Sequence, residues 1–195
     1  MKLRHTLVAI LATGMISIGA AAMLQQGNAK DPMEAFLKSM MPGPEQEWLA
    51  KRAGTWEIDM KFWAAPDTPL GSGKVRSTAT MSFGGRILVT KSTGIILGME
   101  YEGMGFSGHD NAAGQFFNCN VGSMGTGQET GNGTRKGDTL TMTSYNTDPS
   151  TGKPVATRVV ETFEGDDEIH GVAHLIGPGG ADLFKVAEFT AKRVK

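Results

Sequence analysis

Hydrophobic and polar residues alternate one by one over residues 55–62. The hydrophobic positions are Trp56, Ile58, Met60 and Phe62, and the polar positions are Thr55, Glu57, Asp59 and Lys61. A period of two is typical of a strand with one buried and one solvated face. Comparable segments predict ten strands, at residues 55–62, 74–83, 86–95, 100–106, 115–121, 127–132, 139–145, 154–163, 168–176 and 183–193. Strands this short and this closely spaced indicate an antiparallel barrel or sandwich.

The connections between these segments are rich in Gly, Asn, Asp and Pro, which favour tight reversals. The clearest reversals are residues 84–85, 111–114, 148–152, 165–167 and 177–180. Asn132-Gly133 is either a two-residue hairpin turn or part of a longer loop up to Asp138. No long helical pattern separates the strands, so parallel β-α-β units are disfavoured. Gly54-Thr55-Trp56, which opens the first strand, favours a small closed barrel.

Two short helices are predicted before the strands. Asp31 can cap the first helix with Pro32 at its first position. Its apolar side would carry Met33, Phe36, Leu37 and Met40. Residues 45–53 predict a second short helix that packs through Trp48 and Leu49, and Gly54 ends it.

The N-terminus has the pattern of a secretory signal. Lys2 and Arg4 precede an uncharged run over residues 6–24, and Gly27-Asn28-Ala29 fits a small-x-small cleavage site. An uncleaved anchor is the alternative, since roughly 18 apolar residues can just span a bilayer. We therefore predict a signal peptide at 1–29, a helical segment and linker at 30–44, and a barrel domain at 45–195. The expected location is periplasmic or extracellular, without stable membrane insertion after cleavage.

Composition narrows the function classes. The formal net charge of the 195 residues is −1, and losing the two basic residues of the signal would make it more negative. Nucleic acid is therefore not an expected partner. Cys119 is the only cysteine, so no internal disulfide can form. Its alternation with Phe117 and Val121 predicts a small buried residue rather than a reactive thiol.

Several blocks of the sequence resemble one known family. They are Pro42-Gly43-Pro44-Glu45, Trp48-Leu49, Gly54-Thr55-Trp56, Phe83-Gly84-Gly85-Arg86-Ile87-Leu88, Gly108-His109-Asp110-Asn111, Thr147 to Pro154, and Phe184-Lys185-Val186 to Lys192-Arg193. In order and spacing they resemble a bacterial family catalogued as domain of unknown function 1579. The resemblance implies a lipocalin-like (calycin-type) up-and-down barrel and no assigned activity. His109 departs from the family's usual Tyr. By analogy with lipocalins, the resemblance also implies that Arg193 or Lys192 covers the ring of Trp56.

Candidate catalytic and metal-binding residues are few. Gly103 to Gly108 spells a dinucleotide fingerprint, but a turn and a strand follow it where the fingerprint needs a helix. His170 and His174 share a strand face but lie too far apart to bind one ion, and we expect them in solvent. Glu161 shares a strand face with Val159 and Phe163, so it is the acidic residue that we expect to be partly buried. His109 either caps a turn or lines the barrel mouth. No metal or cofactor is predicted.

The apolar residues predicted to face the inside of the barrel are the strongest indication of function. The candidates for ligand contact are Trp56, Ile58, Met60, Phe62, Met81, Phe83, Phe117 and Val121, accompanied by Val75, Ala79 and Cys119 on the same predicted inner face. Such side chains can fill a small barrel or leave room for one small ligand. We predict an exported barrel that binds a small apolar or amphipathic molecule. The alternatives are an enzyme that uses Glu161 and His109 in the same cavity, and an envelope interaction module with a solid barrel.

Overall fold

The computed structural model describes residues 32–195, so the predicted signal segment and the cap at Asp31 lie outside the described residues. The chain divides into two units at Met41/Pro42. In the first unit, helix α2 (Pro32–Met40) carries Glu34 in its first turn and Lys38 in its last, charges that suit the helix dipole. No helix of the described residues has the length and apolar character that crossing a bilayer requires.

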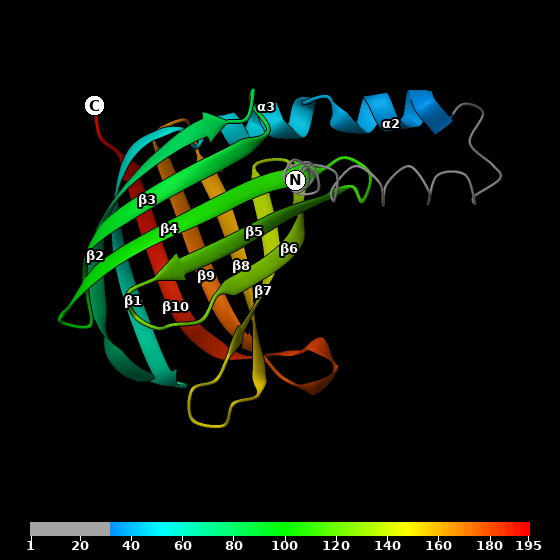
Figure 1. Cartoon of the computed structure of the whole chain (residues 1–195). Coiled ribbons are helices and arrows are strands. Elements are labelled where there is room, and N and C mark those ends of the chain that lie inside the picture. Colours follow the sequence, from blue (N-terminus) through cyan, green and yellow to red (C-terminus); the bar gives the residue numbers. More distant parts are fainter. Residues whose placement is uncertain (1–31) are drawn as a thin grey trace, which may run out of the picture. The chain divides into compact units, whose positions relative to one another are not determined.

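The second unit consists of one short helix and a ring of strands (Figure 1). Its elements are α3 (Pro44–Ala50), β1 (Gly54–Ala65), β2 (Thr68–Ser82), β3 (Ile87–Ile96), β4 (Met99–Asp110), β5 (Gln115–Gly122), β6 (Glu129–Lys136), β7 (Thr139–Thr147), β8 (Pro154–Glu164), β9 (Glu168–Ile176), the 3₁₀ turn η1 (Pro178–Gly180) and β10 (Asp182–Arg193). Each strand pairs antiparallel with its neighbours in sequence. The first and last strands pair from Trp56 opposite Arg193 to Phe62 opposite Ala187, which closes the ring. The predicted all-β, up-and-down barrel is confirmed.

The turns follow the local chemistry of the sequence. Leu97 and Gly98, with φ of 51° and 80°, form the two-residue reversal between β3 and β4 that matches strand twist. Asp110 accepts hydrogen bonds from the backbone N–H groups of Ala112 and Ala113 at 2.8 and 3.1 Å, which stabilises the β4–β5 turn. The predicted reversal at Asn132-Gly133 is wrong. Both residues lie inside β6 opposite β7, and the chain reverses at the following glycine, residue 137.

Strand β5 presents the opposite face to the one predicted. Phe116 is 3% exposed, whereas Phe117, Cys119 and Val121 alternate on the outer face. The two adjacent phenylalanines made both registers plausible, and a shift of one residue exchanges the two faces. Phe116 takes the inner position because its ring packs edge-on against Trp48 of α3, with 5.5 Å between centroids. Cys119 is therefore a partly exposed outer residue, not a buried one.

Phe83 was also predicted to face inward, and this prediction is wrong. Strand β2 ends at Ser82, and Phe83 begins the reversal with a φ of 52° and 72% exposure. A hydrogen bond from the N–H of Arg86 to the carbonyl of Ser82 closes this turn. The alternation of β2 therefore does not extend to Phe83.

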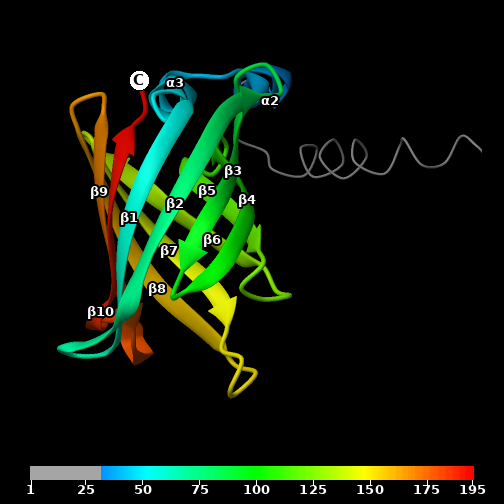
Figure 2. The same ribbon diagram turned by 90° about the vertical axis from the view of Figure 1, so that its left-hand side faces the viewer.

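The packed core lies at the end of the barrel beneath α3. It contains Trp48, Leu49, Trp56, Ala79, Leu88, Phe116, Leu140, Met142, Phe163, Ile169 and Ala191. Helix α3 is tied to the strands by polar contacts as well: Gln46 donates to the carbonyl of His109, and Arg135 of β6 forms a two-pronged ion pair with Glu45 at 2.7 and 2.9 Å. Figure 2 shows α3 across the end of the strand ring. The helix closes this end of the barrel.

Candidate functional site

A cavity of about 450 Å³ occupies the inside of the barrel, and we call it the lumen. All ten strands contribute lining residues, together with Leu49 of α3 and Arg52, which follows it. Another hollow, of about 930 Å³, is lined mainly by residues of β1, β2, β9 and β10, among them the charged Asp59, Lys61, Lys74, Glu188 and Lys192. Several of those charges already pair with each other, as Lys61 does with Glu188 at 3.3 Å. The lumen is therefore the stronger candidate for a site.

One side of the lumen is apolar. Strand β1 contributes Trp56, Ile58, Met60 and Phe62, as predicted from their alternation. Neighbouring strands complete this apolar side with Ala187, Phe189 and Ala191 from β10, Ile169 and Ala173 from β9, Val159 from β8, and Leu140 and Met142 from β7. A ligand on this side would exchange water for hydrocarbon contact.

The opposite side is polar, and we call it the polar wall: Tyr101 of β4, Asn118 and Asn120 of β5, and Glu129 of β6. It is built over glycines. A Cβ added at Gly105 would lie 2.5 Å from the amide oxygen of Asn120. A Cβ at Gly131 would lie 2.7 Å from the amide oxygen of Asn118. The missing side chains let the polar groups lie close against the strands and leave the lumen open.

Three features define the chemistry of the polar wall. The Nδ2 group of Asn120 donates to Glu129 Oε1 at 3.0 Å. Burial, and secondarily the negative charge of Glu129, raises the pKa of Tyr101 above its ordinary value of 10.0, so the phenol stays protonated. The amide oxygen of Asn118 is buried without a hydrogen-bond partner among the described residues. Such an orphaned acceptor in a native fold calls for an explanation.

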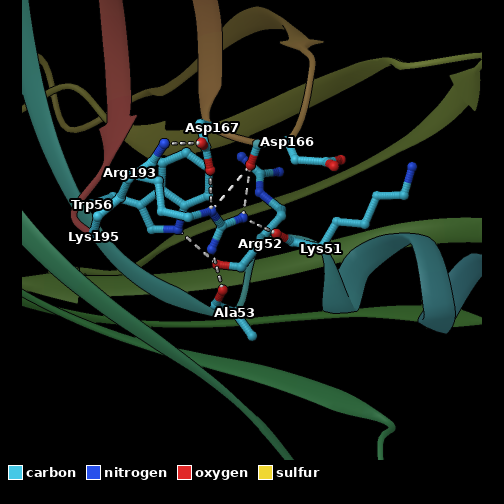
Figure 3. A network of polar contacts seen from close by, with 8 residues as sticks. All are labelled: Lys51, Arg52, Ala53, Trp56, Asp166, Asp167, Arg193 and Lys195. Atoms are coloured by element: carbon cyan, nitrogen blue, oxygen red, sulfur yellow. Dashed lines mark hydrogen bonds and ion pairs between the residues drawn. The ribbon is translucent and has the colours of Figure 1, made fainter.

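Trp56 and Arg193 form the floor of the barrel (Figure 3). The guanidinium carbon lies 4.2 Å from the centre of the Trp56 ring, and the ring nitrogen donates to the carbonyl of Arg52 at 2.9 Å. Arg193 also donates to the carbonyls of Lys51, Ala53 and Asp166 at 2.6 to 3.0 Å. The predicted cation over the tryptophan is thus present, and it is Arg193. One side chain ties the end of α3 to the β8–β9 turn and the last strand.

The two residues proposed for acid–base chemistry do not share a site. Glu161 lines the lumen, where its carboxylate pairs with Arg52 at 2.5 Å. His109 is not among the residues that line the lumen. Its Nδ1 lies 3.0 Å from Asn111 Oδ1, and its ring packs edge-on against Phe116. The geometry gives Glu161 an ion-pair partner and places His109 near the end of β4, beside the β4–β5 turn.

The other predicted residues lie as follows. Met81 packs against the core without lining the lumen, and Val121 faces outward with 46% exposure. Phe117 borders the lumen, although its ring covers Gly108 on the outer face. His170 faces outward between Glu164 and Glu168, with nitrogen–oxygen distances of 3.4 and 2.9 Å. In residues 32–195, no group of three or more His, Cys, Asp or Glu side chains is arranged to hold a metal ion.

Sequence reasoning missed the polar wall and the partner of Glu161. A signal for the polar wall is present, because Asn118 and Asn120 alternate with Phe116 on one face of β5. Glycines at residues 103 and 105 of β4, and at 131 and 133 of β6, mark an inner face that carries few side chains of its own. Arg52 precedes the first strand, where no strand alternation indicates its direction.

Three solved structures align with this chain, and one of them supports the architecture. The protein Rv2717c from M. tuberculosis aligns with a TM-score of 0.57 and 15% identity over 80% of this chain and all of the other. EF1p2_mFAP2b bound to DFHBI aligns at 0.42, with 16% identity over 76% and 98% of the two chains. A redesigned β-barrel, b11L5F_LGL, aligns at 0.40, with 15% identity over 75% and 94%. At these identities the likeness to Rv2717c shows the fold alone, and the two weaker alignments carry no argument.

Among curated proteins, none matches this sequence significantly. A family model does match, over residues 41–193, and this span includes α3 and all ten strands of the barrel. The chain therefore belongs to the family of proteins of unknown function DUF1579.

Proposed function

We propose that the barrel binds and carries a small amphipathic molecule in its lumen. The observation that carries this proposal is a hollow of about 450 Å³ with an apolar side and a polar wall. That volume falls within the range of small-molecule pockets, roughly 300–1,000 Å³. A lining that is mostly apolar, with a few convergent polar groups, is the usual composition of such pockets.

The alternatives have less support. The interaction-module hypothesis needs a solid barrel, which a hollow lumen does not favour. The enzyme hypothesis needs an acid–base pair within hydrogen-bond reach. Glu161 is engaged with Arg52, and His109 lies outside the lumen lining. Binding without chemistry therefore remains our proposal.

A lumen-filling variant tests the proposal directly. Ala173 lines the lumen from β9, so Ala173→Phe would fill the cavity while leaving the outer surface unchanged. Ala113, in the exposed β4–β5 turn, provides a matched control in Ala113→Phe. The probe is the apolar dye N-phenyl-1-naphthylamine, titrated by fluorescence. Wild type and the control should bind saturably with one site, and Ala173→Phe should bind about tenfold more weakly or worse.

Two further measurements are needed, a folding control and an independent detection of bound ligand. Circular dichroism must show that Ala173→Phe keeps its strand content, because overpacking costs about 1–3 kcal/mol. Native mass spectrometry of gently purified wild type should also detect a retained small molecule. Equal dye affinity for both phenylalanine variants would contradict binding in the lumen.

We also propose that the protein acts outside the cytoplasm, on the strength of the sequence pattern in residues 1–29 alone. Intact-mass measurement of the protein from its native host should give an N-terminus at Lys30. A chain that retains residues 1–29 would refute cleavage at this position.

A further inference from the structure

Two carboxylates line the lumen, those of Glu161 and Glu129, and the first is already neutralised. Glu161 pairs with Arg52 at 2.5 Å, whereas Glu188 of β10 pairs with Lys61 and Lys185 on the outer face of the barrel. Glu129 is different. No Lys, Arg or His nitrogen in the described part of the chain lies within ion-pair distance of its carboxylate. Its carboxylate accepts a hydrogen bond from the side-chain amide of Asn120.

The polar groups around Glu129 are uncharged. Asn118 has a buried amide oxygen without a partner in residues 32–195. Tyr101 is protonated at neutral pH, as any phenol with a pKa of 10.0 or higher is, so its hydroxyl adds a hydrogen-bonding group without adding charge. The polar wall therefore offers one full negative charge and, beside it, the uncharged hydroxyl oxygen of Tyr101. A group with several N–H donors and a positive charge complements that arrangement.

The lumen is poorly suited to an anionic head group. Arg52 is the cation among its lining residues, and the carboxylate of Glu161 occupies it. An anion placed at the polar wall would face Glu129 in a partly desolvated cavity, where like charges repel more strongly than in water. An anion placed near Arg52 would have to displace Glu161 and leave that carboxylate without a partner.

We infer that the occupant of the lumen is an amphipathic amine, with a protonated amino group against Glu129 and the polar wall and an apolar body along β1 and β7 to β10. This inference rests on the proposed function, because it names the ligand class of the same cavity. It also gives the glycines of β4 to β6 a role, since they leave space for a head group beside the strands.

Three probes with the same apolar chain separate the head groups: decylamine, decan-1-ol and decanoate. Each is titrated below its micelle concentration by displacement of N-phenyl-1-naphthylamine from wild-type protein. Decylamine should bind about tenfold more tightly than decan-1-ol, because a hydrogen bond to a charged group exceeds one between neutral groups. Decanoate should bind more weakly than either.

Glu129→Gln tests the charge with nearly the same shape. This variant should lose the roughly tenfold preference for decylamine and leave the affinity for decan-1-ol unchanged. Glu102→Gln is the matched control, because Glu102 is an exposed residue of β4 on the outer face. It should retain the wild-type order of affinities.

The outcomes separate this inference from the proposed function. If decan-1-ol or decanoate bound wild type as tightly as decylamine, the amine assignment would be wrong, while the lumen would still be a binding site. If the dye itself showed no saturable binding, the proposed function would fail first. The ranking of the three probes needs no variant, so it stands even if Glu129→Gln does not fold.

Discussion

Replacing Arg193 is the most direct test of how the barrel is closed. Its guanidinium covers the ring of Trp56 and donates to three carbonyls, which belong to Lys51, Ala53 and Asp166. The side chain is 22% exposed, so these interactions are only partly screened by water. Arg193→Met would keep much of the apolar stem and remove both the charge and the donors.

The expected loss follows from these contacts. A cation over an indole contributes about 0.5–2 kcal/mol. Each hydrogen bond to a charged donor is worth about 1.5–3 kcal/mol when buried, which partial exposure reduces to about 1 kcal/mol here. Arg193→Met should therefore lower the free energy of unfolding by about 4 kcal/mol. Arg193→Lys keeps the cation but not the planar fork, and should lose about half as much.

Urea denaturation, followed by tryptophan fluorescence, measures the loss. In thermal melts, about 4 kcal/mol corresponds to a drop of roughly 8–16 °C for a domain of this size. Lys192→Met is the matched control. Lys192 precedes Arg193, and its side chain is 67% exposed, with its nitrogen 4.0 Å from Glu168. So weak an ion pair should change the free energy of unfolding by less than about 0.5 kcal/mol. Equal losses at the two positions would refute the argument that Arg193 holds the floor together.

Two further predictions concern β6: one concerns Gly133 on its inner face, and the other concerns the ion pair between Arg135 and Glu45. Gly133→Ala should destabilise the barrel by about 2 kcal/mol or more in urea denaturation, because the added Cβ would meet the backbone carbonyl of Thr141. Gly125→Ala, with open space around it, should change stability by less than about 0.5 kcal/mol, and similar losses in both variants would contradict this reading. The hydrogen bond from Arg135 holds the pKa of Glu45 below its ordinary value of 4.5, against the opposing effect of burial. A lowered folded pKa means that this stability is present above pH 4.5 and is lost as the pH falls through the folded value. Glu45→Gln should therefore shrink the stability difference between about pH 6 and about pH 3 by about 1 kcal/mol, and an unchanged difference would count against the ion pair.

The closed barrel could be predicted because its signals are local and agree with each other. The alternation in residues 55–62 places Trp56 inside, and the turn residues separate short strands without helices between them. The meeting of the last strand with Trp56 also followed, because the family resemblance implied that Arg193 or Lys192 covers the Trp56 ring. In the structure, Trp56 lies directly opposite Arg193 in the β1–β10 register.

The polar wall could not be located by the same reasoning. Hydrophobic alternation identifies the inner face of a strand only where that face is apolar. In β5 the outer face carries Phe117, Cys119 and Val121, and the inner face carries Asn118 and Asn120. The rule therefore pointed to the wrong side. A tertiary contact settles the register, namely the packing of Phe116 against Trp48, because the alternation within β5 fits either face.

The same inversion explains how one small barrel can be both stable and hollow. Large apolar side chains gather beneath α3, where Trp48 packs edge-on against Phe116 and Phe163 at 5.5 and 5.3 Å. Away from that end, the inner faces of β4 to β6 carry glycines and short polar groups that cannot fill the interior. Filling them with large hydrophobic residues would bury more apolar surface and add stability. The polar wall lacks this burial, and Glu129 has no cation partner in the described residues. Both features fit a cavity that binds a ligand from outside the chain.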